Sequence, residues 1–312
     1  MNFNEKTMQK AAVVVSLAVL ANLLWGSAPA LIKTGYAMFQ VASDDTAAQI
    51  LFAGCRFFLA GIMGVIIGSV LNGGLLLPRK SSWSKILLLA LFQTVVQYIF
   101  FYIGCANAPG YKVSIACSAG SFFSILFAAL LFRQEKLSAK KVLGCLLGFA
   151  GVVLVNLKAG SNFDLDMRFV GEGFIIISSC AFAMSSALTK VFSKTENPVM
   201  LCGYQFVLGG AVLIGLGLAM GGRLVMSQSI GVLLIGYLAM VSAVAFSINS
   251  ILIKYNPVSR VTIFGFLNPI FGVLLSMLIL KESGQDFGIR GALALLLVCA
   301  GVLLVNYTKK EA

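Results

Sequence analysis

The sequence predicts an all-α integral membrane protein in which ten transmembrane helices form two inverted five-helix repeats around a central cavity. Three features support this prediction: the composition, a series of long apolar runs, and an internal repeat. Of the 312 residues, 59% are hydrophobic and only 11% are charged. Because a water-soluble domain carries roughly a quarter charged residues, we expect most of the surface to face lipid.

The apolar runs have the length and pattern of membrane helices. Crossing a hydrocarbon core of about 30 Å takes about 20 apolar residues in a helix, and only helices or closed barrels satisfy their backbone there. The runs are continuous and lack the alternation of barrel strands. We expect helices at 11–36, 48–71, 84–106, 113–132, 140–157, 169–190, 199–220, 228–252, 260–280 and 287–306.

The 23 Lys and Arg residues lie in short clusters between these runs. Such clusters are typical of topology-setting charge, whereas a nucleic-acid-binding protein carries a continuous basic stripe. With the N-terminus inside, the inner segments hold 15 of these residues and the outer segments 7. Because cytoplasmic loops are enriched in Lys and Arg, we expect a multi-pass protein of the cell (plasma or inner) membrane, with both termini cytoplasmic and no nucleic-acid partner.

Two similar heptapeptides reveal an internal repeat. The fifth predicted helix ends AGVVLVN at 150–156, and the tenth ends AGVLLVN at 300–306. We therefore expect one repeat at 1–158, with helices one to five, and a second at 159–312, with helices six to ten. Because five is odd, the second repeat inserts in the opposite orientation, an arrangement typical of transporters that work by alternating access.

Several features in sequence order carry a resemblance to a known family. They are the Trp25-Gly26 to Lys33 pattern in helix one, RFFLAG at 56–61 in helix two, Glu135 and Glu282 closing helices four and nine, and the glycine-spaced helices five and ten. The chain resembles the drug/metabolite transporter (DMT) superfamily in its EamA-type ten-helix branch. The resemblance implies a central cavity among helices one, three, four, six, eight and nine, and transport of amino acids, other small metabolites, drugs or sugar derivatives.

Polar and aromatic residues at membrane depth are the candidate site, because such side chains tend to face a cavity or another helix. Gln93 and Gln97 share one helix face, and Asn268 precedes a helix-breaking proline. The alternative for the amides and hydroxyls is hydrogen bonding between packed helices. The candidate substrate-binding residues are Trp25, Gln93, Gln97, Tyr98, Tyr102, Ser121, Asn249 and Asn268.

The repeat alignment pairs residues of the two halves. It places Tyr98 opposite Phe246 and Trp25 opposite Phe182. Arg56 lies well inside a predicted helix, and we expect it to bond to loop backbone near the outer surface. Its counterpart in the second repeat is the neutral Gln205.

No acidic residue lies at the middle of an apolar run, and the chain has no histidine. A proton relay or a cation site would use such groups. We therefore favour facilitated diffusion or exchange, with a proton- or cation-coupled drug exporter as the alternative. The seven cysteines form no CxxC pair, so we expect no metal and no cofactor.

We expect a transporter that moves a small metabolite, an amino acid or a related neutral or zwitterionic solute, by export. An enzyme is not expected, because no nucleophile and base pair, metal set or paired carboxylates occur at membrane depth. A non-transporting signalling protein is disfavoured by the repeat. Glycine pairs such as Gly64 with Gly68 and Gly144 with Gly148 predict close helix packing inside a monomer, so we expect a monomer or a weak homodimer.

Overall fold

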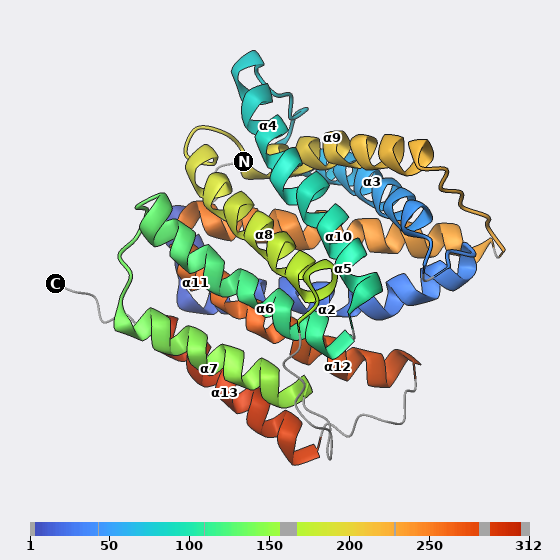
Figure 1. The fold of residues 1–312 in the computed structure, drawn as a ribbon. Helices are drawn as coiled ribbons and strands as arrows, with labels where there is room; N and C mark the ends of the chain where they lie inside the picture. The colour runs from blue at the N-terminus through green and yellow to red at the C-terminus, as the bar shows by residue number, and fades with distance from the viewer. Residues whose placement is uncertain are drawn as a thin grey trace.

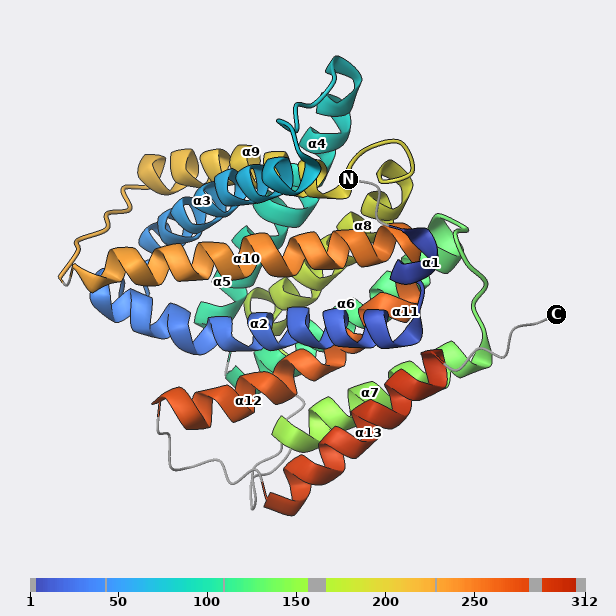
Figure 2. The same cartoon turned by 180° about the vertical axis from the view of Figure 1, so that it is seen from behind.

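A computed structural model describes residues 4–42, 44–108, 110–156, 167–227, 229–280 and 288–306. Within these ranges nearly every residue is helical and no strand occurs. Figures 1 and 2 show the helices as one bundle seen from its two sides. The all-α prediction is confirmed, and the predicted boundary between residues 158 and 159 lies outside the described residues.

Helical structure occurs in each of the ten predicted runs. The first repeat contains α1 (Glu5–Met8), α2 (Ala11–Met38), α3 (Thr46–Asn72), η1 (Lys80–Ser82), α4 (Trp83–Leu89), η2 (Ala90–Val96), α5 (Gln97–Asn107), α6 (Gly110–Leu126), η3 (Phe127–Leu131) and α7 (Ala139–Asn156). The second contains η4 (Phe169–Gly173), α8 (Phe174–Phe192), α9 (Pro198–Ala219), α10 (Ile230–Tyr255), α11 (Val258–Thr262), η5 (Ile263–Phe266), α12 (Leu267–Leu280) and α13 (Gly288–Asn306).

Among the described residues, seven helices are long and apolar enough to cross a membrane. They are Ala11–Met38, Thr46–Asn72, Lys80–Asn107, Lys112–Leu131, Phe169–Phe192, Pro198–Ala219 and Ile230–Tyr255, and Gly291–Asn306 is a shorter apolar helix. The protein is therefore a multi-pass membrane protein.

Local sequence signals explain where several helices begin and end. The Asp45 carboxylate accepts a hydrogen bond from the Ala48 N–H at 2.8 Å, so it caps the start of α3. Asn197 caps α9 in the same way, and Pro198 occupies the first turn, where a missing N–H costs nothing. Gly73 ends α3 with a left-handed φ of 68°, which suits glycine.

Helices that correspond in the two repeats pack against each other. The pairs α3 with α9 and α7 with α13 make the two most extensive contacts in the described structure. Figures 1 and 2 show both pairs side by side, with α7 and α13 beside α12 and at the opposite side of the bundle from α3 and α9. The long helices α2 and α10 also lie alongside each other. The repeat is therefore visible in the packing as well as in the sequence.

Glycines allow these helix pairs to approach closely. A Cβ added to Gly61 would lie 2.7 Å from the Gly203 carbonyl oxygen, and one added to Gly68 would lie 2.7 Å from a Val199 methyl. A Cβ added to Gly144 would lie 2.8 Å from the Gly301 carbonyl oxygen. The prediction that glycine pairs pack helices within the monomer is confirmed.

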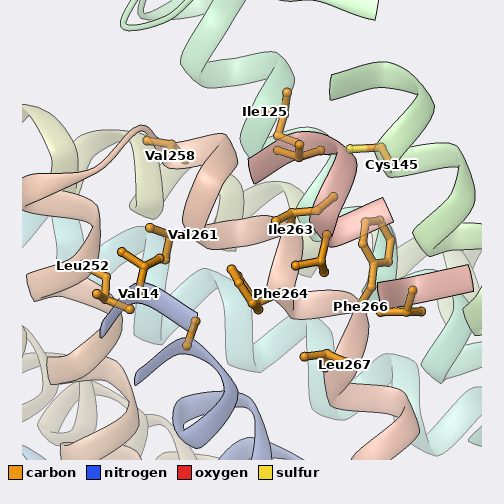
Figure 3. Packing of buried hydrophobic residues seen from close by; sticks show 14 of the residues in the cluster. Val14, Ile125, Cys145, Leu252, Val258, Val261, Ile263, Phe264, Phe266 and Leu267 are labelled. Carbon is orange, nitrogen blue, oxygen red and sulfur yellow. The ribbon is translucent and has the colours of Figure 1, made fainter. Parts of the chain in front are cut away.

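A short broken helix lies at the centre of the largest apolar cluster. Figure 3 shows Val261, Ile263, Phe264 and Phe266 of α11 and η5 among side chains from α2, α6, α7 and α10. The 3₁₀ turn of η5 ends at Phe266, and Asn268-Pro269, the predicted site of a helix break, lies in the first turn of α12. Irregular backbone at membrane depth is tolerated only where protein or a cavity surrounds it, and here protein does.

Gly210 and Gly215 on α9 offer a direct test of this packing. A Cβ at Gly210 would lie 2.7 Å from the Phe58 Cα, whereas one at Gly215 meets nothing within 4 Å. We expect Gly210→Ala to destabilise the protein by about 1–3 kcal/mol because the backbones must separate. Gly215→Ala, the matched control, should leave stability unchanged or slightly raised. Thermal unfolding of the purified variants in detergent measures both effects, and equal melting temperatures would contradict the role of Gly210.

Candidate functional site

Trp25 lies where α2 meets helices of the second repeat. Its indole ring makes edge contacts with Phe246, at 4.9 Å between ring centroids, and with Phe182, at 6.3 Å. The next residue, Gly26, lets α12 approach, since an added Cβ would lie 2.6 Å from the Phe271 Cβ. Trp25 and Phe182 are also counterparts in the repeat alignment, so equivalent positions of the two halves touch at this point.

A small cavity of about 20 Å³ opens beside the Trp25 ring. A volume of this size holds about one water molecule, so the structure is closed around the site. Two polar atoms of the lining, Trp25 Nε1 and Asn22 Oδ1, are buried and make no hydrogen bond in the described structure. The lining residues thus carry one donor and one acceptor without a partner in the described structure. Its lining residues are Asn22, Trp25, Phe182, Asn249, Val261, Thr262 and Gly265.

The predicted site residues fall into two groups. Trp25 and Asn249 line the cavity. Ser121 adjoins it, because a Cβ added to the lining residue Gly265 would lie 2.5 Å from the Ser121 hydroxyl oxygen. The cavity also includes Asn22, which the sequence interpretation missed. The available signal was its helical spacing, because Asn22 lies three residues before Trp25 and shares its helix face.

The remaining candidates do not line this cavity. Gln93 is buried in the π-helical turn η2. Gln97 begins α5, and its buried side-chain oxygen Oε1 has no partner in the described structure. Tyr98 and Tyr102 belong to an aromatic cluster at the α3 side. Asn268 is half-buried on α12, where its backbone oxygen faces Gly26.

A series of ring contacts joins the cavity to this aromatic cluster. Phe246, which touches Trp25, also contacts Phe206 at 5.0 Å, and Phe206 stacks on Phe57 at 5.1 Å. Phe57 then contacts Tyr98 at 4.2 Å. Phe57 and Phe206 are counterparts in the two repeats, since they follow the aligned pair Arg56 and Gln205. The series therefore crosses the interface between the repeats.

Arg56 lies at the cluster end of the ring series and is only 3% exposed. Its Nε donates to the Leu238 carbonyl at 3.3 Å, and its Nη2 donates to the Ser242 hydroxyl at 2.8 Å. Both acceptors belong to α10. The expectation that Arg56 bonds to loop backbone near the outer surface is therefore wrong, because α10 packs directly against α3 and supplies oxygens inside the bundle.

Polar contacts close the end of the bundle that carries α1. Glu135, which follows η3, accepts hydrogen bonds from the Ser259 N–H at 2.9 Å and from the Ser259 hydroxyl at 2.6 Å. Lys141 pairs with the same carboxylate at 2.9 Å. Lys190 donates to the carbonyl oxygens of Lys254 and Asn256 at 2.9 and 2.8 Å. The Glu135 contacts link the first repeat to α11. The Lys190 contacts link α8 to the end of α10.

Within the described residues, no group of three or more His, Cys, Asp and Glu side chains could hold a metal ion. All seven cysteines are free thiols. The arrangement at the site is therefore one of aromatic rings, amides and a guanidinium, which suits binding of a small organic solute.

Comparison with known proteins identifies the family. The model of the EamA-like transporter family matches residues 12–157 and again residues 169–307. An uncharacterized transporter of Bacillus subtilis is 24% identical over 98% of this chain and 95% of its own length. An uncharacterized transporter of Methanothermobacter thermautotrophicus is 23% identical over 74% of this chain and 67% of its own.

Two further matches agree with these. A chloroplastic WAT1-related protein of Arabidopsis thaliana is 23% identical over 82% of this chain, which spans 62% of that relative's length. A solved crystal structure has the same fold, with a TM-score of 0.74 at 19% identity over 95% of this chain and 96% of that one. The two family matches together cover most of the sequence, one for each repeat, and the chain belongs to the EamA-like transporter family of the DMT superfamily.

Proposed function

We propose that this membrane transporter moves a small metabolite, an amino acid or a related neutral or zwitterionic solute, out of the cell by alternating access. The observation that carries the proposal is the Trp25 cavity, which lies between the repeats and is lined by Trp25 and Asn22, whose buried Nε1 and Oδ1 atoms have no partner in the described structure. Unpaired polar atoms in a nearly dry interior are costly, so a ligand that pairs with them is favoured. Aromatic walls with a few placed polar groups are typical of small-molecule sites.

Alternating access follows from the position of the cavity between the repeats. Trp25 and Phe182 are equivalent residues of two halves that insert in opposite orientations. A movement that opens the cavity to one side of the membrane therefore has an equivalent movement, with the roles of the halves exchanged, that opens it to the other side. The cavity holds about one water molecule. We interpret this conformation as an occluded state, from which a solute-sized space opens when the halves move.

The contacts around Glu135 are our candidate for the gate at the α1 end. Glu135 lies on the connection between α6 and α7, and Ser259 lies at the start of α11 in the other repeat. A charge-assisted pair with two donors holds these segments together more strongly than neutral bonds do. The distribution of Lys and Arg favours a cytoplasmic location for this end, in the cell membrane.

The described membrane helices favour movement without proton coupling. Glu172, in η4, is a buried carboxylate at the start of the predicted helix 169–190, and it accepts a hydrogen bond from the Arg168 N–H and pairs with Lys112 at 3.8 Å. It therefore caps a helix start and is not a relay at mid-membrane. A proton-coupled drug exporter is the second candidate function, because other members of the superfamily export drugs.

Trp25→Ala tests the cavity. Removing the ring enlarges the cavity and deletes the donor, so we expect export of the solute to fall at least about tenfold, corresponding to roughly 1.4 kcal/mol. Trp25→Phe keeps a ring without the donor and should retain more activity. Flux of labelled solute in proteoliposomes is the measurement, and normal flux in the alanine variant would contradict the proposal. The melting temperature of each variant separates lost function from lost folding.

Glu135→Ala tests the gate. It leaves the Ser259 N–H and hydroxyl without their acceptor, which costs about 1–3 kcal/mol. We therefore expect amide hydrogen exchange in α11 to accelerate about tenfold or more. Lys141→Met is the matched control, because it removes the ion pair but leaves the carboxylate on Ser259, and its effect should be clearly smaller. Equal amide exchange rates in α11 of both variants and the wild type would show that the contact between Glu135 and Ser259 does not keep this end of the bundle closed.

Proton coupling has its own test. Proteoliposomes with an imposed pH gradient should carry labelled solute down its concentration gradient, and they should not accumulate it. The reason is the lack of a titratable carboxylate at mid-membrane in the described helices. Robust, gradient-dependent uphill transport would favour the second candidate instead.

A further inference from the structure

Arg56 carries a buried charge with no counter-ion in the described structure. It is 3% exposed, its hydrogen bonds go to a carbonyl and a hydroxyl, and it lies 5.1 Å over the Phe57 ring. Within the described residues it forms no ion pair with a carboxylate. A charge at membrane depth is costly unless it is paired, and such residues mark ligand or ion pathways.

Two buried hydroxyl groups lie beside Arg56. The hydroxyls of Tyr36 and Tyr102 are buried and lie next to each other, and the Tyr102 hydroxyl also lies beside the Arg56 guanidinium. They lie close enough to interact with each other and with the Arg56 charge. The bonds from Arg56 to α10 use Nε and Nη2, so Nη1 lies outside them. The same small region thus holds a cation and two O–H donors.

We propose that Arg56, Tyr36 and Tyr102 form a carboxylate-binding subsite for the transported solute. This inference rests on the proposed function and specifies one end of the substrate. A carboxylate accepts several hydrogen bonds and matches the guanidinium fork in geometry. Its single negative charge equals the one positive charge of Arg56, whereas a phosphate group carries nearly two at neutral pH.

The subsite lies at the interface between the repeats. Tyr36, Arg56 and Tyr102 come from α2, α3 and α5 of the first repeat, while Ser242, which holds the guanidinium, comes from α10 of the second. The ring series from Phe57 to Trp25 connects it with the cavity. A carboxylate that binds here therefore bridges elements of both halves, and its release can be coupled to their movement.

The second repeat argues against a purely structural role for the charge. Gln205 occupies the position equivalent to Arg56, is fully buried, and accepts a hydrogen bond from the Thr94 hydroxyl at 2.7 Å. At this position of the helix pair α3 and α9, a neutral amide is therefore sufficient for packing and hydrogen bonding. The guanidinium supplies a positive charge that the packing itself does not need.

Paired probes that differ only in the carboxylate test the subsite. Phenylalanine is compared with phenylalaninamide, and benzoate with benzamide, by thermal unfolding of the purified full chain at millimolar concentrations, with inorganic phosphate as a further probe. We expect the carboxylates to raise the melting temperature more than the amides do, because a ligand that binds the native state stabilises it. In Arg56→Gln the preference should disappear, with carboxylate affinity falling about tenfold to a hundredfold.

Three more variants guard against loss of folding. Tyr102→Phe keeps the ring and removes only the hydroxyl, so the unliganded protein should still unfold cooperatively, while carboxylate binding weakens. Lys33→Gln removes one positive charge from an exposed position on α2 and should keep the wild-type preference. Arg56→Lys keeps a charge but loses the planar fork, so it should bind carboxylates with intermediate affinity.

The outcomes separate this inference from the proposed function. Equal shifts for acids and amides, no shift with any carboxylate, a shift with phosphate alone, or a preference that survives Arg56→Gln would each overturn the subsite. If carboxylates bind through Arg56 but labelled phenylalanine and benzoate do not cross proteoliposome membranes, the subsite stands and the transport proposal fails. If solutes cross without regard to the carboxylate, transport stands and the subsite fails.

Discussion

The close contact between α3 and α9 is the constraint on which the rest of the architecture depends. Because lipid solvates apolar side chains as well as protein does, helices in a membrane associate through close packing and hydrogen bonds and gain little from the hydrophobic effect. Gly61, Gly203 and Gly210 bring the two backbones into contact. This contact sets Phe57 against its counterpart Phe206, and through them it fixes where the aromatic series and Arg56 meet α10.

Much of the fold could be predicted because lipid imposes a simple rule on sequence. A run of about 20 apolar residues must be helical at membrane depth, so the helical segments were visible without any tertiary information. The duplicated heptapeptide likewise identified the halves. The π-helical turns η2 and η4, and the short helix α1, were not predicted, since their hydrogen-bond shifts depend on neighbouring helices and leave no periodic signal in the sequence.

The candidate site was less predictable than the fold. Trp25 was identified because its size and amphipathic ring are conspicuous in an apolar run, and Asn249 because amides are rare there. The partner of Arg56 could not be found in this way. Ser242 is 186 residues away in the chain, and a local reading offered only nearby loops as acceptors. The same limit applies to Tyr36, whose hydroxyl becomes notable only when Tyr102 is placed beside it.

The placement of the tryptophans has a practical consequence. The chain contains two, and they differ in surroundings, since Trp25 is half-buried at the cavity while Trp83 is 39% exposed on α4 at the periphery of the bundle. The emission of an indole depends on the polarity around it. The protein therefore carries an intrinsic optical reporter at its candidate site, which registers wetting or filling of the cavity without any attached dye.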